Sequence, residues 1–307
     1  MLRKFQVHIL GSSAAAPTSL RQTSAQLVAY HNKFFLLDCG EGTQIQLRRF
    51  RLSILKIDHI FISHLHGDHY LGLPGLLLTM HLLGRKKELK VYAPPGIREI
   101  IEVHFTYSQL EPCYPVLYTE IMSGGQRLYE DKYLSVESIG MKHRIPTYGF
   151  LLKEKNQIRN LRKESLFEYD IPRDQIAAIK TGADYVIPGG TVIPNHEITM
   201  PPPKPRVYAF GSDTTYTEDF LDQIRGADIL YHEATFLDNM AVIASEKMHS
   251  TTTQAAQIAS KAAVKSLLLG HYSARYNDLE EFLQEARKIF PNTWLAEEGN
   301  VFRVGEE

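Results

Sequence analysis

Short apolar runs separated by glycine-containing turns dominate the first part of the chain. Runs of this kind, rich in Val, Ile, Leu and Phe, predict β-strands. The strands expected here span 6–10, 24–30, 33–38, 58–63 and 89–93. Between them, apolar residues recur at helical spacing, which predicts helices at 41–49, 71–84 and 97–105.

The rest of the chain repeats this order of strands followed by helices. Strands are expected within 116–140 and at 147–153, 206–210, 267–270 and 293–296. Helices are expected at 218–225, 252–263 and 279–289, and Ser250 or Thr251 is the expected N-cap of the second. In each half of the chain, strands come first and helices follow. This order favours two sheets packed against each other with helices on their outer faces.

One segment, 154–203, differs in character from its surroundings. It is charged at its start, becomes rich in proline and glycine, and ends in three consecutive prolines. We therefore expect an inserted arm within a single domain that spans 1–307. The basic residues in and beside it are Lys153, Lys155, Arg159, Arg162, Lys163, Arg173 and Lys180. Part of this positive charge is offset by the acidic residues Glu154, Glu164, Glu168 and Asp170. The segment is therefore either a basic surface that binds nucleic acid or an ordinary solvent-exposed face.

Composition narrows the class of protein. The chain has 307 residues, of which 44% are hydrophobic and 22% charged, as is typical of globular proteins. Its net charge of -1 provides no overall positive field, so any RNA contact has to come from a local patch. Cys39 and Cys113 lack metal-type spacing and are expected to be reduced thiols. No signal-peptide pattern and no apolar run of roughly 18 residues is present, which predicts a cytoplasmic protein without a membrane partner.

The candidate chemistry centres on the end of the predicted strand 58–63. His64, His66, Asp68 and His69 crowd one tight turn directly after it. Imidazoles and a carboxylate crowded together need hydrogen-bond partners or a counter-charge. A divalent cation bound between them satisfies both, because it accepts the lone pairs and balances the negative charge. These donors suit Zn2+. A solvated histidine-rich loop is the alternative.

Three later residues also follow predicted strands. Asp213 comes after the strand 206–210, His271 follows 267–270, and His143 lies just past a strand that ends near 140. Each of them alone is more typical of a structural residue. Together they supply the further ligands that two metal ions need and that one turn cannot provide.

The run 64–69 resembles the signature of the metallo-β-lactamase superfamily, and the later His143, Asp213 and His271 follow in that superfamily's order. The resemblance implies an α/β fold, the four-layer αββα sandwich, with metals at one edge. It also implies two Zn2+ per subunit, with Mn2+ or another divalent metal as a substitute. The implied ligands are His64, His66, His143 and Asp213 for one ion, and Asp68, His69, Asp213 and His271 for the other, with Asp213 bridging.

Further motifs resemble one family in this superfamily, the tRNA 3′-processing endonuclease tRNase Z (ribonuclease Z). Residues 35–44 are similar to its first motif and 63–75 to its extended second motif. The segments 232–235 (His-Glu-Ala-Thr) and 249–251 (His-Ser-Thr) resemble its paired motifs, and 271–276 resembles its last metal motif. The paired motifs, rather than the histidine run, point to this family.

The resemblance implies an endoribonuclease that removes the 3′ trailer from precursor tRNA. The products would be a 3′-hydroxyl on the tRNA and a 5′-phosphate on the trailer. Asp68 would act as general base, and His249, held by Glu233, would protonate the departing 3′-oxygen. His232 and Glu233 are either orienting residues or direct participants. The family also implies a homodimer in which the arm of one subunit serves the site of the other.

Substrate contacts are expected from two arginines. Arg275 either binds a phosphate or forms a structural salt bridge. Arg21 is the second candidate, although the loop 17–22 keeps only Pro17 and Arg21 of the family's Pro-x-Lys-x-Arg-Asn pattern. The Gly-Pro element of the family's arm is absent, and 171–175 lies near its place.

Two other function classes compete with this interpretation. A small-molecule hydrolase of the same fold, acting on a lactone, phosphodiester or arylsulfate, gains nothing from a basic arm. A non-catalytic RNA-binding module is expected to lack a metal ligand or the general base, and the sequence retains all of them.

Overall fold

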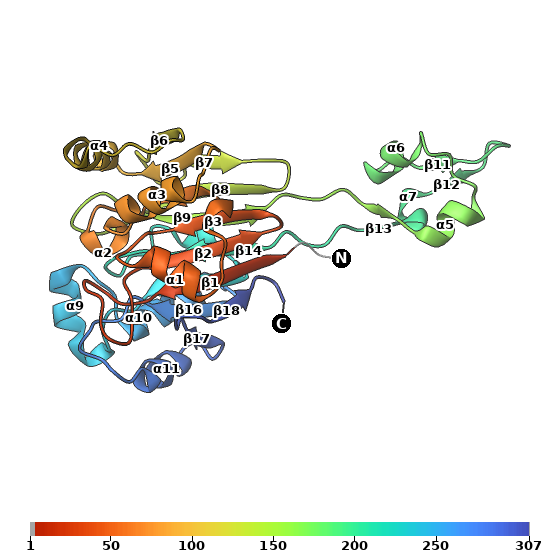
Figure 1. Ribbon diagram of the computed structural model, residues 1–307. Helices are drawn as coiled ribbons and strands as arrows, with labels where there is room; N and C mark the ends of the chain where they lie inside the picture. Colours follow the sequence, from red (N-terminus) through yellow and green to blue (C-terminus); the bar gives the residue numbers. More distant parts are fainter. Residues whose placement is uncertain (1–3, 307) are drawn as a thin grey trace.

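Two seven-stranded sheets pack face to face and carry helices on their outer surfaces (Figure 1). The computed structural model describes residues 4–306; positions 1–3 and 307 of the expected single domain lie outside that range. No helix among the described residues is long and apolar enough to cross a membrane. The four layers confirm the αββα sandwich that the sequence predicts.

The first sheet has the strand order β18-β1-β2-β3-β4-β5-β6. Pairing is antiparallel from β18 to β3 and parallel from β3 to β6. Its strands are β1 (Phe5–Gly11), β2 (Ala25–Tyr30), β3 (Lys33–Leu37), β4 (Ile57–Phe61), β5 (Leu89–Ala93), β6 (Val116–Glu120) and β18 (Val301–Arg303).

The second sheet has the order β17-β16-β15-β14-β9-β8-β7. It is antiparallel from β7 to β14 and parallel from β14 to β17. Its strands are β7 (Arg127–Glu130), β8 (Leu134–Met141), β9 (Thr147–Glu154), β14 (Val207–Phe210), β15 (Ile229–Glu233), β16 (Ser266–Gly270) and β17 (Thr293–Leu295).

Apolar side chains fill the space between the sheets and under both helical layers. Phe61 of the first sheet meets Phe150 and Phe210 of the second in the central cluster. The alternating residues of the strands face outward and are covered by helices, which makes each sheet apolar on both faces. The helices of the body are α1 (Thr43–Arg49), η1 (Ile54–Lys56), α2 (Gly67–Tyr70), α3 (Leu73–Leu82), α4 (Ile97–Ser108), α8 (Leu221–Ile224), η2 (Asp238–Met240), α9 (Ala241–Lys247), α10 (Thr252–Lys261) and α11 (Glu280–Arg287).

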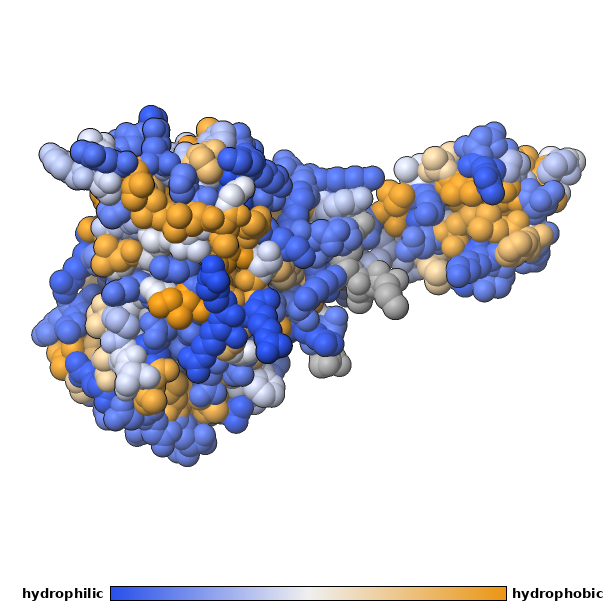
Figure 2. All heavy atoms as spheres, in the orientation of Figure 1, coloured by the Kyte–Doolittle hydropathy of each residue, from blue (hydrophilic) through white to orange (hydrophobic). Residues whose placement is uncertain are grey.

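The inserted segment leaves the body as a long arm with a small globular end (Figure 1). Figure 2 shows apolar side chains on the exposed surface of this end. Beneath them, Ile171, Ile179, Tyr185 and Ile198 form a separate core. The elements of the arm are β10 (Asn160–Leu161), α5 (Lys163–Glu168), α6 (Ile176–Lys180), β11 (Tyr185–Val186), β12 (Val192–Ile193), α7 (Asn195–Ile198) and β13 (Thr199–Met200).

Several local predictions need correction. The strand β15 was not expected, because only three apolar residues precede its polar end at His232 and Glu233. The helix expected at 218–225 shrinks to α8, and the one at 71–84 begins later, at α3. Of the two candidate caps, Thr251 is the N-cap of α10, and its side chain and that of Gln254 form a capping box.

A buried ion pair clamps the root of the arm. Glu154 is the last residue of β9, so the arm begins one residue later than predicted. Its carboxylate accepts hydrogen bonds from Arg206 Nε (2.9 Å), Nη2 (2.8 Å) and the backbone N–H (3.0 Å). Glu154 and Arg206 are only 3% and 4% exposed.

We expect Glu154→Gln to lower the free energy of unfolding by about 3 kcal/mol, because it removes the carboxylate charge that faces the buried Arg206 guanidinium. Urea unfolding of both proteins at equal metal loading measures this loss. The double variant Glu154→Leu/Arg206→Met removes both charges and should recover most of the stability. An unchanged unfolding midpoint for Glu154→Gln contradicts the clamp.

Candidate metal centre

The candidate ligands lie in segments that follow four different strands. The run 64–69 follows β4 and enters α2, His143 follows β8, Asp213 follows β14 and His271 follows β16. The carboxyl end of β4 in the first sheet and those of β8, β14 and β16 in the second meet at one edge of the sandwich, and strand ends are where ligands commonly bind. The structure therefore gathers residues that lie up to about two hundred positions apart in sequence.

The turn after β4 is held by close backbone packing. A Cβ atom at Gly72 would lie 2.0 Å from the carbonyl oxygen of Gly40, so a larger residue has no room there. The Gly72 N–H donates to the carbonyl of Cys39 at 2.9 Å. Asp38, the residue before Cys39, adopts a left-handed backbone with φ of 56° and points its carboxylate into the turn. Strained conformations of this kind concentrate at functional sites.

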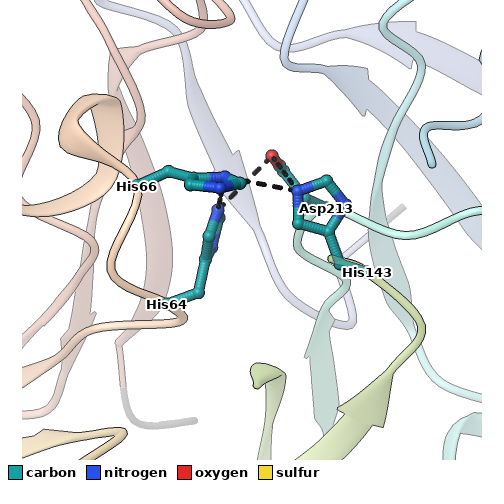
Figure 3. A group of neighbouring side chains, drawn as sticks. All are labelled: His64, His66, His143 and Asp213. Carbon is teal, nitrogen blue, oxygen red and sulfur yellow. Dashed lines mark hydrogen bonds and ion pairs between the residues drawn. The ribbon is translucent and has the colours of Figure 1, made fainter. Parts of the chain in front are cut away.

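One group of side chains comprises His64, His66, His143 and Asp213 (Figure 3). His66 Nδ1 lies 3.0 Å from His64 Nε2 and 3.3 Å from His143 Nε2. Asp213 Oδ2 is 3.6 Å from His64 Nε2 and 3.9 Å from His143 Nε2. All four donor atoms thus face a common point.

A second group shares Asp213 with the first. His69 Nε2 lies 3.2 Å from His271 Nε2 and 3.4 Å from Asp68 Oδ2. Asp213 Oδ2 is 3.5 Å from His69, and its Oδ1 is 3.2 Å from His271. The structure therefore brings together all seven residues expected as ligands, with Asp213 between the two groups.

The electrostatics of the site favour a bound cation. Burial opposes the charged form of His69, but the Asp68, Asp213 and Asp38 carboxylates outweigh it and raise the pKa of His69 well above its usual value. Burial lowers the pKa of His64 well below its usual value, which leaves that ring neutral with a free lone pair. The buried Asp213 Oδ1 forms no hydrogen bond within the described residues. Carboxylates that attract positive charge, beside neutral imidazoles, fit a divalent metal.

Groups behind the ligands fix their orientation. Asp38 Oδ2 lies 2.7 Å from His69 Nδ1, and the Met248 carbonyl accepts from His143 Nδ1 at 2.8 Å. Both contacts leave the Nε2 lone pair of the imidazole free to face the cluster, as a ligating histidine requires. Met248 has a left-handed backbone, with φ of 57°, which turns its carbonyl toward His143.

Asp68 is held from the opposite side by the chain itself. The backbone N–H of Ala15 donates to Asp68 Oδ2 at 2.7 Å, and Ala15 is left-handed with φ of 63°. Burial raises the pKa of Asp68, but His69 and His271 outweigh burial and hold that pKa well below its usual range. The carboxylate is therefore ionised and fixed in direction.

His249 and Glu233 form a pair beside the metal groups. His249 Nδ1 donates to Glu233 Oε1 at 2.8 Å, and Glu233 is fully buried. Burial opposes charge on the His249 ring, but the Glu233 carboxylate more than offsets this and raises the pKa of His249 to about 9. His249 Nδ1 also lies 3.9 Å from Asp213 Oδ2, so the protonated ring stands next to the cluster.

His232 is not part of this pair. Its Nδ1 lies 2.7 Å from the carbonyl oxygen of Glu233, and its ring stacks on Phe220 at 6.2 Å. It is 1% exposed. Of the two roles considered for His232, a structural one agrees with this position.

A cleft of about 430 Å³ opens over the cluster. Its walls include Ala15, Pro17, Asp68, Phe236, Lys247 and His249. Arg275 lies at its rim, where the guanidinium stacks 5.0 Å from the Phe236 ring and Nε donates to Ser273 Oγ at 3.1 Å. The salt bridge considered for Arg275 is absent from the described part of the chain.

The expectation for Arg21 needs correction. Its guanidinium donates to the backbone carbonyl of Tyr276 and lies over the Tyr272 ring at 5.9 Å. The side chain is 8% exposed and lines a different cavity, next to Leu279. Arg21 therefore ties the loop before β2 to the last metal motif and turns away from the cleft.

Proteins related in sequence identify the family. A ribonuclease Z of Phocaeicola vulgatus is 43% identical over 298 residues, which cover 97% of this chain and 96% of that protein. A ribonuclease Z of Bacteroides thetaiotaomicron is 44% identical over 304 residues, covering 99% and 96%. The chain belongs to the ribonuclease Z family.

Solved structures agree with this ribonuclease Z assignment. The short form of human tRNase Z superposes with a TM-score of 0.72 at 27% identity, covering 98% of this chain and all of that one. The metallo-β-lactamase fold protein YhfI of Bacillus subtilis, 17% identical with a TM-score of 0.70 over 98% of this chain and 100% of that one, shares the fold. A family model described as anti-Pycsar protein Apyc1 matches residues 5–110. Fold and donor set together make the cluster a site for divalent metal.

Proposed function

We propose that this ribonuclease Z family member is the endoribonuclease that removes the 3′ trailer from precursor tRNA. Cleavage leaves a 3′-hydroxyl on the tRNA and a 5′-phosphate on the trailer. The observation that carries the proposal is the sequence identity of 43% and 44%, over 97% and 99% of the chain, to two proteins named ribonuclease Z. The cluster of seven ligand-type side chains, contributed by segments that follow strands of both sheets, supports hydrolysis as the reaction.

We assign the cluster two Zn2+ per subunit, with Mn2+ as a substitute. His64, His66, His143 and Asp213 would hold one ion, and Asp68, His69, Asp213 and His271 the other. The donor atoms of the first set lie together, as do those of Asp68, His69 and His271. Asp213 joins this second set through its contacts with His69 and His271. When bound, such ions supply Lewis acidity, which activates water and stabilises charge on phosphoryl oxygens.

The residues of the chain supply the proton transfers. Asp68 is ionised and fixed by Ala15, so its carboxylate can accept the proton of the attacking water. His249, protonated against Glu233, donates a proton to the departing ribose 3′-oxygen. The two groups come from separate parts of the chain, since Asp68 lies in α2 and His249 follows α9.

We expect His249→Ala to lower kcat on precursor tRNA by about 10²–10⁴-fold, because a ribose alkoxide is a poor leaving group without a proton. The kcat of the same variant should fall far less on a p-nitrophenyl phosphodiester, because the nitrophenolate is a good leaving group without protonation. Steady-state rates on both substrates with one preparation measure the difference. Equal losses on the two substrates rule out the acid role.

The arm would grip the tRNA. Arg162, Lys163 and Arg173 are exposed at its end, and Phe167 beside them is 87% exposed. Cations that neutralise phosphates and an aromatic ring that stacks on a base are the usual elements of single-stranded or looped RNA recognition. Arg275, which forms no ion pair with a carboxylate among residues 4–306, would bind a phosphate near the scissile bond.

We also propose a cytoplasmic homodimer. Ile45 of α1, Leu71 after α2 and Leu82 of α3 are 66%, 54% and 82% exposed on one helical layer. A second copy of the chain covering this layer would remove these side chains from water. Light scattering of the purified protein should give twice the mass of one chain, and a single-chain mass excludes the dimer.

One assay tests the function directly. The protein is incubated with Zn2+ or Mn2+ and a precursor tRNA that carries a 3′ trailer, and cleavage is expected just after the discriminator base. Removal of metal by a chelator should abolish cleavage, and adding Zn2+ back should restore it. Rapid hydrolysis of a small phosphodiester without cleavage of the tRNA would favour the small-molecule hydrolase instead.

A further inference from the structure

The side chain of Thr235 lies where the Glu233–His249 pair meets the metal groups. Its hydroxyl oxygen is 2.7 Å from Glu233 Oε2, 3.0 Å from His271 Nδ1 and 3.3 Å from His249 Nδ1. Thr235 follows β15 by two residues and is 3% exposed. A single buried hydroxyl thus connects the proposed acid pair to a proposed metal ligand.

The direction of each hydrogen bond follows from counting donors around Glu233. Its Oε1 accepts from the Thr214 N–H at 3.0 Å and from His249 Nδ1 at 2.8 Å. Its Oε2 accepts from the Thr235 N–H at 3.1 Å and from the Thr235 hydroxyl. An ionised carboxylate only accepts, and a hydroxyl has one proton to donate. The Thr235 proton therefore goes to Glu233.

This direction determines the protonation of the His271 ring. Because the Thr235 proton is engaged by Glu233, the oxygen can only accept from His271 Nδ1. His271 then carries its proton on Nδ1 and presents an unprotonated Nε2 to Asp68 and Asp213, which lie 3.3 and 3.2 Å away. The opposite tautomer would point an N–H at the position where a cation binds.

We propose that Thr235 is a positioning residue that sets the tautomer and direction of His271 for metal binding. The inference rests on the proposed metal centre. It gives Glu233 two tasks, since the carboxylate holds His249 directly and holds His271 through the Thr235 hydroxyl. The loop after β15 thus orders the acid and one ligand of the second metal group together, while Met248 holds His143 in the first group.

Matched substitutions test the hydroxyl. Thr235→Val keeps the shape and removes the hydrogen bonds, whereas Thr235→Ser keeps the hydroxyl. Competition of the zinc-loaded proteins with a chromophoric chelator measures affinity without any RNA. We expect Thr235→Val to lower the affinity for the more weakly bound zinc ion by about 10–100-fold, the usual effect of losing a hydrogen bond that orients a ligand. The affinity of Thr235→Ser should stay within a few-fold of wild type. Equal affinities for Val and wild type overturn the proposal.

A second measurement needs no variant and covers the case in which Thr235→Val fails to fold. Long-range proton–nitrogen NMR of the metal-free wild-type protein, with His271→Gln for assignment, reports which ring nitrogen of His271 carries the proton before a bound ion can determine it. A proton on Nδ1 supports the proposal, and a proton on Nε2 refutes it. Both readouts are independent of tRNA cleavage, so a protein that binds zinc as expected but leaves precursor tRNA intact contradicts the proposed function and not the role of Thr235.

Discussion

Asp68→Ala should reduce turnover of precursor tRNA by about 10²–10⁴-fold or more, the range expected for loss of a general base. The carboxylate contacts His69 and His271 and is held by the Ala15 N–H, so no other side chain replaces it in that position. Binding of the tRNA should change little, because the proposed phosphate contacts lie on the arm and at Arg275. Single-turnover cleavage and a filter-binding assay measure the two effects separately.

Asp68→Asn is the matched control for this experiment. The amide keeps the size of the side chain and an oxygen that can face a metal, but it cannot accept a proton from water. If Asp68 serves as base, Asn should be nearly as inactive as Ala while keeping more zinc. A near wild-type rate for either variant means that another group takes the proton.

The gathering of the candidate ligands was predictable because each ligand segment follows a strand. His64 follows a strand of the first sheet, Asp213 and His271 follow strands of the second, and the carboxyl ends of these strands meet at one edge of the sandwich. The paired motifs at 232–235 and 249–251 were also recognisable, although they resemble a family rather than reveal a geometry. For His232 the sequence left two roles, and its burial and its contact with the Glu233 carbonyl, which the sequence does not reveal, favour the orienting one.

Contacts made by the backbone were beyond reach of the sequence. Nothing in the type of Ala15 or Met248 indicates that a left-handed conformation aims an N–H at Asp68 or a carbonyl at His143. Arg21 was expected to contact substrate because it is a charged residue in the loop that resembles a substrate-binding motif. In the structure its guanidinium donates a hydrogen bond to the carbonyl of Tyr276, a contact that the spacing of residues in the sequence does not reveal.

Deleting 156–198 should separate tRNA binding from catalysis. The body retains its three apolar clusters, and β9 pairs directly with β14 in the register Lys153 with Val207, so the residues left behind can close a loop between them. We expect weaker binding of precursor tRNA with an unchanged rate on a p-nitrophenyl phosphodiester. If about three cations of the arm contact phosphates, the slope of log K against log salt should fall by roughly three.

A variant with an intact arm shows whether the arm binds tRNA through its positive charge or through its shape. Arg162→Gln/Lys163→Gln/Arg173→Gln removes three exposed cations and leaves the small core around Ile179 and Tyr185 untouched. If phosphate contacts dominate, this variant should lose most of the salt dependence that the deletion loses, and Phe167→Ala should weaken binding at every salt concentration alike. An arm that served only as a solvated face would leave tRNA binding unchanged in all three proteins. Equal loss of tRNA and small-ester hydrolysis on deletion would instead mean that the arm supports the fold of the catalytic body.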